Sequence, residues 1–263
     1  MKIIYKNSDE IRGMRKSNRI LARVLSELKT MIEPGIETRE LDRYAESRAR
    51  ELGGIPAFKG YRGYPASLCT SVNEEIIHGI PSSRRLREGD IVSLDFGVIL
   101  DGFYSDAAVT HPVGRVSETA LKLIRTAQDA FQAGLGEFRD GRRISDISHA
   151  VQVAVEKQGF SVIRAFVGHG IGLSLHEEPQ IPNFGTPGFG PKIRPGMTLA
   201  IEPMISVGSW EVEILSDRWT AITKDRSLAA HFEHSVALTE RGAEILSSMD
   251  EEVGIPYAKE SVS

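Results

Sequence analysis

Five residues in or beside apolar strand patterns could together bind divalent metal ions. A carboxylate in such a position is costly to bury unless it is paired or bound to a cation. Four carboxylates and one imidazole form a hard, oxygen-rich set that favours Mn²⁺, Fe²⁺ or Co²⁺ over a structural zinc held by thiolates. The four carboxylates also carry more negative charge than one divalent ion can balance. A pair of ions about 3.5–4 Å apart would suit them. The candidates are Asp95, Asp106, His169, Glu202 and Glu233.

Two of these carboxylates lie on a predicted hairpin. Residues 91–100 and 103–112 have strand patterns joined by a two-residue Asp-Gly turn. With that turn Asp95 faces Ala108, and Asp106 is its diagonal neighbour on the same face, about 7–8 Å away at Cα. Two ionised carboxylates at this distance repel each other unless a cation lies between them. For any one candidate taken alone, a turn or cap role is the more common explanation.

Two histidines outside strand patterns could contribute acid–base chemistry. His78 lies in NEEIIHGIP and His176 in SLHEEPQ, both flanked by turn or loop signals. A lone histidine is more often solvated or satisfied in the core. Beside a dinuclear site, however, imidazoles could hydrogen-bond a scissile amide and its oxyanion.

The elements that must position these residues occur twice. Residues 87–95 and 194–202 share an Arg, a Gly turn, an apolar run and a final carboxylate, 107 residues apart. Helical patterns at 9–32 and 117–136 precede segments in which a turn leads into a second amphipathic helix, starting at Gly35 and Gly141. Each half is therefore predicted as helix, helix, then strands.

The domain prediction follows from this repeat. Residues 1–249 form one catalytic domain with half-repeats of about 9–115 and 116–249, and 250–263 form a flexible tail. Later strands are expected at 161–168, 197–206, 210–215, 218–224 and 231–238, with a Pro- and Gly-rich loop at 182–196. In the last strand, alternation places Glu233 opposite Phe232, His234, Val236 and Leu238.

Composition excludes several classes of protein. The 263 residues are 41% hydrophobic and 26% charged, which is ordinary for a soluble globular protein. A net charge of −4 gives no basic surface for reading nucleic acid. The only cysteine, Cys69, excludes an internal disulfide and fits a reducing compartment. No signal peptide or membrane span is apparent, so a cytoplasmic location is expected.

Taken together, the motifs resemble those of the type I methionine aminopeptidases, which share the pita-bread fold with prolidases and creatinase. The resemblance covers about residues 9–248. The segments that carry it are GYPASLCTSVNEEIIHGIP, SLDFGVILDGFYSDAAVT, VGHGIGLSLHEEPQIPNF, LAIEPM and TKDRSLAAHFEHSVALT. It implies an α+β fold of two pseudo-symmetric helix-helix-strand halves, with a central antiparallel sheet and helices outside.

The resemblance also implies a mechanism. Asp95 would hold one metal together with bridging Asp106 and Glu233, and His169 and Glu202 would complete the other. A bridging water or hydroxide would attack the carbonyl of an N-terminal methionine. The two ions would be Co²⁺, Mn²⁺, Fe²⁺ or Zn²⁺.

Catalytic roles follow for three residues. Glu202 would accept the proton of the attacking water. His176 would stabilise the oxyanion, and His78 would contact the scissile peptide bond.

The methionine pocket is implied by the same resemblance. Tyr64, Cys69 and Trp219 would hold the methionine side chain, with Phe58 and Tyr61 nearby. The chain departs from the usual family pattern at Leu175, often Phe, at Phe58, often Cys, and at Ala107, often a small hydroxyl residue. These departures concern the shape of the pocket rather than the metal ligands.

Two alternatives were weighed against this interpretation. An Xaa-Pro dipeptidase or aminopeptidase P usually has a large N-terminal domain, and Asp95 comes too early in the chain for one. A non-catalytic module of the same fold should have lost ligands, and none is missing. The 31 residues between Glu202 and Glu233 leave no room for the insertion of type II enzymes.

The expected partners are Met-initiated peptides and nascent chains, and the ribosome is a further candidate. The expected oligomeric state is a monomer.

Overall fold

The chain folds around one large antiparallel sheet, in a computed structural model that describes residues 2–248. The helices are α1 (Ser8–Lys29), α2 (Thr38–Glu51), α3 (Glu118–Glu137) and α4 (Ile144–Glu156), with a 3-10 turn at Tyr61–Gly63. The strands of the first half are β1 (Ile55–Pro56), β2 (Leu68–Val72), β3 (Glu75–Ile77), β4 (Ile91–Leu100) and β5 (Phe103–Pro112). Those of the second half are β6 (Ser161–Val162), β7 (Val167–Gly170), β8 (Glu177–Pro182), β9 (Thr198–Ile201), β10 (Met204–Ser206), β11 (Val212–Ile214), β12 (Ala221–Thr223), β13 (Ala229–Thr239) and β14 (Gly242–Ile245).

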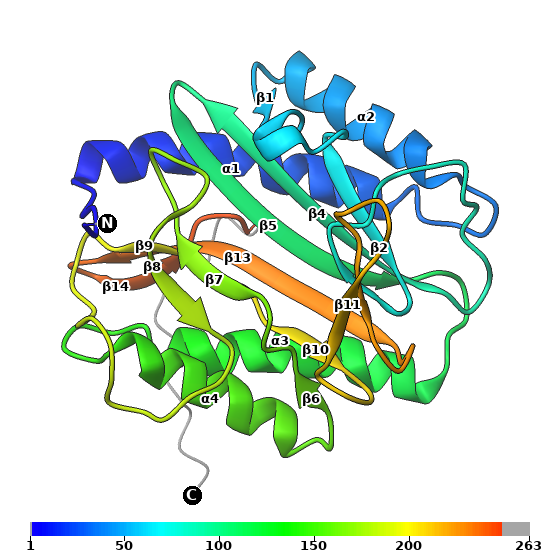
Figure 1. The fold of residues 1–263 in the computed structure, drawn as a ribbon. Coiled ribbons are helices and arrows are strands. Elements are labelled where there is room, and N and C mark those ends of the chain that lie inside the picture. Colours follow the sequence, from blue (N-terminus) through cyan, green and yellow to red (C-terminus); the bar gives the residue numbers. More distant parts are fainter. Residues whose placement is uncertain (1, 249–263) are drawn as a thin grey trace, which may run out of the picture.

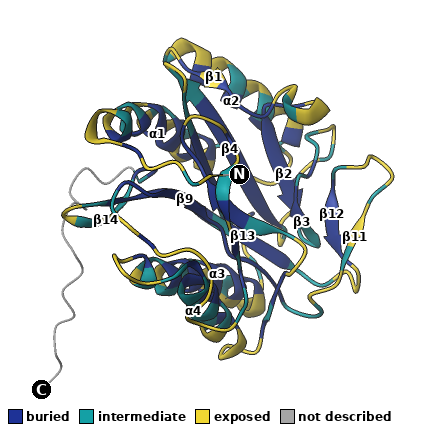
Figure 2. Ribbon diagram, turned by 60° about the vertical axis from the view of Figure 1, so that its left-hand side comes forward, coloured by how far each residue is buried: buried dark blue, intermediate teal, exposed yellow. Residues whose placement is uncertain are grey.

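The sheet runs in the order β1-β4-β5-β13-β9-β7-β8, with β2 also on β4 and with β10 and β14 on β13. A smaller sheet has the order β11-β12-β3. Figure 1 shows α1 beside β4 and β5, and α3 along β13. α2 packs against β1 and β2, and α4 packs against α3, β6 and β8. The central strands β4, β5, β9 and β13 are mostly buried, whereas β11 and the outer faces of the helices are exposed (Figure 2). This arrangement confirms the predicted α+β class, with a central antiparallel sheet and helices outside it.

Helix placement follows from capping and apolar spacing. The Asn7 side chain accepts the backbone N–H groups of Asp9 and Glu10, and Glu10 accepts the N–H of Asn7, which forms a capping box before α1. Leu21, Leu25 and Leu28 then recur at helical spacing and pack against α2 and β4. Each fully buried Leu contributes about 1.5–3 kcal/mol. No helix within residues 2–248 is long and apolar enough to cross a membrane.

Two helices start at positions that match the sequence repeat. α2 begins at Thr38 and α4 at Ile144, which are 106 residues apart. In both, a carboxylate at the third helical position accepts the N–H of the residue before the helix. The division into half-repeats, and a two-fold axis near the site, stay predictions, and the tail at 250–263 lies outside the described residues.

The β4–β5 hairpin has the predicted register. Leu100 pairs with Phe103 and Asp95 with Ala108, while Asp106 pairs with Gly97. The turn residues Asp101 and Gly102 have φ of +52° and +81°, as a two-residue turn of this hand requires. Asp95 and Asp106 are therefore diagonal neighbours on one face.

Some strands differ from the sequence prediction. The segments 161–168 and 197–206 are each divided in two, and β11 and β12 are shorter than expected. The apolar pattern does not predict β8, because Glu177-Glu-Pro-Gln is polar. β8 lies at the edge of the sheet beside β7, where a proline is tolerated.

Candidate active site

Five neighbouring strands bring the candidate ligands together. Asp95 lies on β4, Asp106 on β5, Glu233 on β13 and His169 on β7, and Glu202 directly follows β9. Ala108 of β5 pairs with both Asp95 and Glu233, so the two carboxylates flank one position of the sheet. All five side chains are buried, with 2–7% of each residue exposed. Residues that are up to 138 positions apart in the sequence (233 − 95 = 138) thus converge on one buried point.

The distances fit a shared metal centre. His169 Nε2 lies 3.5 Å from Glu202 Oε1 and 4.0 Å from Asp106 Oδ2. The ligand atoms of Asp106, His169 and Glu233 lie within 4.8 Å of one another, and so do those of Asp95, His231 and Glu233. Because Glu233 belongs to both groups, it is placed to bridge two adjacent cations.

The electrostatics of the cluster call for positive charge. Burial, together with the charge of Glu202, raises the pKa of Asp95 to about 7, and burial raises the pKa of Glu202 to about 7. Burial and repulsion by neighbouring carboxylates raise the pKa of Asp106 and Glu233 well above the ordinary range. Within the described chain, Asp95 Oδ1, Asp106 Oδ1 and Glu233 Oε1 are buried without a hydrogen-bond partner. Each of these unpaired carboxylate oxygens could be a ligand atom for a divalent cation. The residues therefore fit a pair of metal ions.

His169 is oriented as a ligand. Its Nδ1 lies 2.9 Å from the carbonyl oxygen of Gly170, so an Nδ1–H donates to that carbonyl and Nε2 is left with its lone pair. Ligating histidines are usually held by such a bond from the other ring nitrogen.

The cluster forms one end of a cavity of about 330 Å³. Aromatic side chains and histidines make up the rest of its wall, which gives one apolar space beside one polar centre. The lining residues are Phe58, Tyr61, Arg62, Tyr64, Cys69, Ile77, His78, Asp95, Asp106, Ala165, Phe166, Val167, His169, His176, Glu202, Trp219 and Glu233.

His176 reaches the centre from the residue before β8. Its ring centroid lies 4.2 Å from that of His169, and its Nδ1 lies 2.8 Å from the Tyr61 hydroxyl. Burial and the neighbouring His169 lower the pKa of His176 to about 3, so the imidazole is neutral near pH 7.

His78 lines the same cavity and has an unusual backbone. It directly follows β3 and has φ of +61°, the left-handed region that non-glycine residues rarely adopt. Its ring makes edge contacts with Phe166 and Trp219, at centroid distances of 5.7 and 6.2 Å. Burial lowers the pKa of His78 to about 4, so this ring is neutral too.

Known proteins resemble the chain along nearly its whole length. The profile of metallopeptidase family M24 matches residues 12–240. Methionine aminopeptidase 1 of Bacillus subtilis is 50% identical over 93% of this chain and 99% of its own, and the methionine aminopeptidase of Clostridium perfringens is 53% identical over 93% and 98%. The chain belongs to the methionine aminopeptidases of family M24.

Solved structures agree with this membership. The crystal structure of methionine aminopeptidase from Thermotoga maritima superposes with a TM-score of 0.92 at 46% identity, covering 94% of this chain and 100% of that one. Prolidase from Pyrococcus furiosus has a TM-score of 0.77 at 22% identity, and the match covers only 66% of its chain. The prolidase therefore shares the fold alone.

In a methionine aminopeptidase, the apolar part of the cavity is the candidate binding region for the side chain of the substrate. Tyr64 and Trp219 meet edge to face at 5.1 Å, and the Tyr64 hydroxyl donates to the Gly79 carbonyl at 3.0 Å. Burial raises the pKa of the Cys69 thiol, which keeps it protonated and inert. Leu175 differs from expectation because it does not line the cavity: it is 2% exposed and packs in the cluster of Phe58, Tyr64 and Cys69.

The sequence motifs miss several residues of the site in this methionine aminopeptidase. Arg62, Ile77 and residues 165–167 line the cavity but carry no local chemical signal. His231, in contrast, does have a sequence signal. It lies two residues before Glu233, and strand alternation puts it on the same face of the strand. Its Nε2 lies 3.6 Å from Glu202 Oε2.

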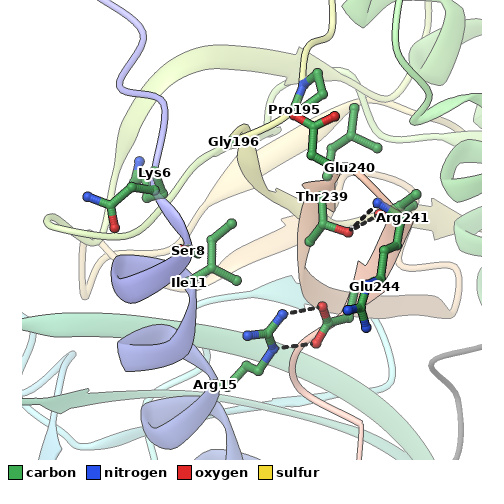
Figure 3. A pocket seen from close by; sticks show the side chains of 14 residues that line it. Lys6, Ser8, Ile11, Arg15, Pro195, Gly196, Thr239, Glu240, Arg241 and Glu244 are labelled. Carbon is green, nitrogen blue, oxygen red and sulfur yellow. Dashed lines mark hydrogen bonds and ion pairs between the residues drawn. The ribbon is translucent and has the colours of Figure 1, made fainter.

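A larger cavity of about 700 Å³ lies elsewhere, between the start of α1 and the β13–β14 turn (Figure 3). Two of its charged residues are paired: Arg15 holds the carboxylate of Glu244 through Nε at 2.6 Å and Nη2 at 2.7 Å. Neither of the buried metal-binding groups contributes to it. We therefore place the active site in the smaller cavity.

Proposed function

We propose that this chain hydrolyses the N-terminal methionine from peptides and nascent proteins, with a preference for a small second residue. The observation that carries the proposal is the meeting of a five-residue ligand cluster with a cavity of about 330 Å³ that is lined largely by aromatic side chains. A cavity that ends beside the cluster suits one side chain at a chain terminus. Membership of the methionine aminopeptidases supports methionine as that side chain.

The ligand roles follow the family resemblance. Asp95 would hold one divalent ion, His169 and Glu202 would hold a second, and Asp106 and Glu233 would be shared between them. When bound, the two cations supply Lewis-acid polarisation and neutralise the four carboxylates.

The remaining steps belong to side chains of this chain. Glu202 accepts the proton of the attacking water. His176 donates a hydrogen bond to the oxygen of the scissile carbonyl as negative charge develops there. A Tyr61 hydroxyl that donates to Nδ1 of His176 fixes the proton of the ring on Nε2, which is the tautomer this role requires. The neutral imidazole of His78 hydrogen-bonds the scissile amide, opposite His176.

The methionine side chain is assigned to the apolar wall. Tyr64, Cys69 and Trp219 contact it, with Phe58 and Tyr61 beside them. Leu175 supports this wall from behind.

The test is hydrolysis of Met-Ala-Ser by purified protein loaded in turn with Mn²⁺, Fe²⁺, Co²⁺ and Zn²⁺. We expect release of free methionine, loss of activity with a chelator, and no release from the N-acetylated peptide. An Xaa-Pro dipeptide is the control for prolidase activity, and Asp106→Asn is the matched inactive variant. If no ion supports methionine release, the proposal fails.

We further propose that the protein acts in the cytoplasm as a monomer, on chains that emerge from the ribosome. The single buried cysteine suits a reducing compartment. Mass from light scattering tests the monomer. Co-sedimentation with ribosomes, in high and low salt, tests docking.

A further inference from the structure

His231 lies inside the metal cluster and has no part in the mechanism above. It is 1% exposed and lies on β13, where its backbone N–H donates to Thr110 Oγ1 and its carbonyl accepts from the same hydroxyl. The ring points at the carboxylates: Nε2 lies 3.6 Å from Glu202 Oε2 and 3.8 Å from Glu233 Oε2. Two roles are open to such a ring, metal ligand or hydrogen-bond donor.

The two histidines of the cluster differ in how the second ring nitrogen is held. His169 donates Nδ1–H to the Gly170 carbonyl, which leaves Nε2 free to ligate. In the described part of the chain, both ring nitrogens of His231 are buried without a hydrogen-bond partner, but only Nε2 has carboxylate oxygens near it, at 3.6 and 3.8 Å. If Nε2 of His231 ligated a metal, the proton would sit on Nδ1 as a buried N–H without an acceptor, which folded proteins avoid. With the proton on Nε2, the N–H faces two carboxylates.

Glu202 is therefore bracketed by two imidazoles. Its Oε1 lies 3.5 Å from His169 Nε2, and its Oε2 lies 3.6 Å from His231 Nε2. Its backbone carbonyl accepts from Asn183 Nδ2 at 2.9 Å, which fixes the main chain behind it. A hydrogen-bond donor on the Oε2 side would fix the plane of the Glu202 carboxylate and direct Oε1 toward the proposed metal site.

We propose that His231 is a positioning residue: its imidazole donates Nε2–H toward Glu202, with Glu233 as the second acceptor, and holds both carboxylates in place for the cations. It acts through those carboxylates rather than by touching metal or substrate. The proposal rests on the metal site of the proposed function, but not on the identity of the substrate.

The experiment compares His231→Gln, whose amide keeps a donor at similar reach, with His231→Leu, which removes the donor at similar volume. Three readouts are used: Mn²⁺ affinity by calorimetry, the visible spectrum of the Co²⁺-loaded protein, and kcat and KM on Met-Ala-Ser. His234→Leu is the control, because His234 lies on the opposite face of β13 against Phe131. If His231→Leu does not fold, His231→Asn replaces it, since its amide is too short to reach.

We expect His231→Leu to weaken Mn²⁺ binding roughly 10–100-fold, as loss of a partner behind a ligand does, and to lower kcat with little change in KM. His231→Gln should restore most of both. The ligand-field bands of Co²⁺ should keep the same coordination number and ligand type in His231→Gln. Metal affinity in His231→Leu equal to that of the wild type or of His234→Leu would overturn the proposal.

Loss of an imidazole ligand from the Co²⁺ spectrum in both His231 variants would overturn it as well, in favour of direct ligation. If the wild-type protein binds metal tightly but does not release methionine, the proposed substrate is wrong, and the proposal for His231 is not affected. The calorimetric and spectral comparison would then still decide the role of His231.

Discussion

Lys6 and Glu177 form a buried ion pair behind the loop that carries His176. The two side chains are 1% and 4% exposed. The other carboxylate oxygen of Glu177 accepts the N–H of Leu173 at 2.7 Å and of Ser174 at 3.2 Å, and the Lys6 ammonium also donates to the Ile4 carbonyl at 3.1 Å. The segment before α1 thus anchors the loop that presents His176 to the site.

Glu177→Gln should destabilise the protein by about 3–5 kcal/mol, because it leaves the Lys6 charge buried without an opposite charge. The double variant Lys6→Met/Glu177→Gln should recover part of that loss. Denaturant unfolding of the four proteins in the cycle measures both. The matched control is the Arg12–Asp9 pair, with side chains 67% and 75% exposed, where Arg12→Gln should cost less than about 1 kcal/mol. Equal losses at the two pairs would contradict a structural role for the buried one.

Glu202→Gln should nearly abolish turnover while leaving the metal-free protein folded. The change removes an anionic ligand and the proposed proton acceptor, but it also removes one of four crowded carboxylates. We therefore expect a metal-free melting temperature equal to or above that of the wild type, and a smaller rise on adding Mn²⁺. Melting curves with and without metal check this, and near wild-type turnover would exclude the assigned role.

The stability of the metal-free protein should fall as pH rises from about 6.5 through about 7. The folded pKa of Asp95 and of Glu202 is raised to about 7, above the ordinary carboxyl range. The folded state therefore holds protons that the unfolded state has already lost, and this contribution disappears as pH passes the folded value. His78 and His176 have lowered pKa values, so they stay neutral in the folded state throughout this window.

Metal should reverse this dependence, because cations replace the protons and bind better as the carboxylates ionise. The measurement is melting temperature against pH in chelator and in Mn²⁺. Parallel curves in the two conditions would contradict the coupling of proton and metal binding.

His176→Ala should lower kcat by roughly 10²–10³, the scale of losing one oxyanion donor. Tyr61→Phe should have a smaller effect in the same direction, because it removes only the hydroxyl that orients His176 at 2.8 Å. Steady-state kinetics on Met-Ala-Ser separate the parameters. A change confined to KM in either variant would argue against the oxyanion role.

Peptides with a bulky second residue should be poor substrates. His78 is held between Phe166 and Trp219, so the wall that faces the second residue has little room to yield. The ratio of kcat/KM for Met-Ala-Ser and Met-Leu-Ser measures this preference. Similar values for the two peptides would show that the second residue lies away from that wall.

The sequence was sufficient wherever the chemistry depends on local pattern. The Asp-Gly turn determines the register that places Asp95 and Asp106 on one face, and strand alternation separates Glu233 from Phe232 and His234, which pack against Phe131. Of the thirteen site residues that the sequence motifs led us to expect, twelve line the cavity. The exception is Leu175.

Relationships between distant segments were not accessible in the same way. The Lys6–Glu177 pair joins residues 171 positions apart, and neither member has a motif that signals its partner. β8 is polar and was missed, because its strand form comes from pairing with β7 rather than from burial of an apolar face. His231 could have been found, since the same alternation that exposes Glu233 to the site also exposes the residue two positions earlier.

The backbone at His78 has a consequence for how this fold can be improved. A left-handed conformation costs a non-glycine residue about 1–2 kcal/mol, and Gly79 beside it has no room for a side chain, since a Cβ would lie 2.3 Å from the Thr70 carbonyl oxygen. His78→Gly would relieve the backbone, but it would also remove a buried ring that packs against Phe166 and Trp219. Backbone strain and the placement of one imidazole are therefore coupled at residue 78, and a change that relaxes the first gives up the second.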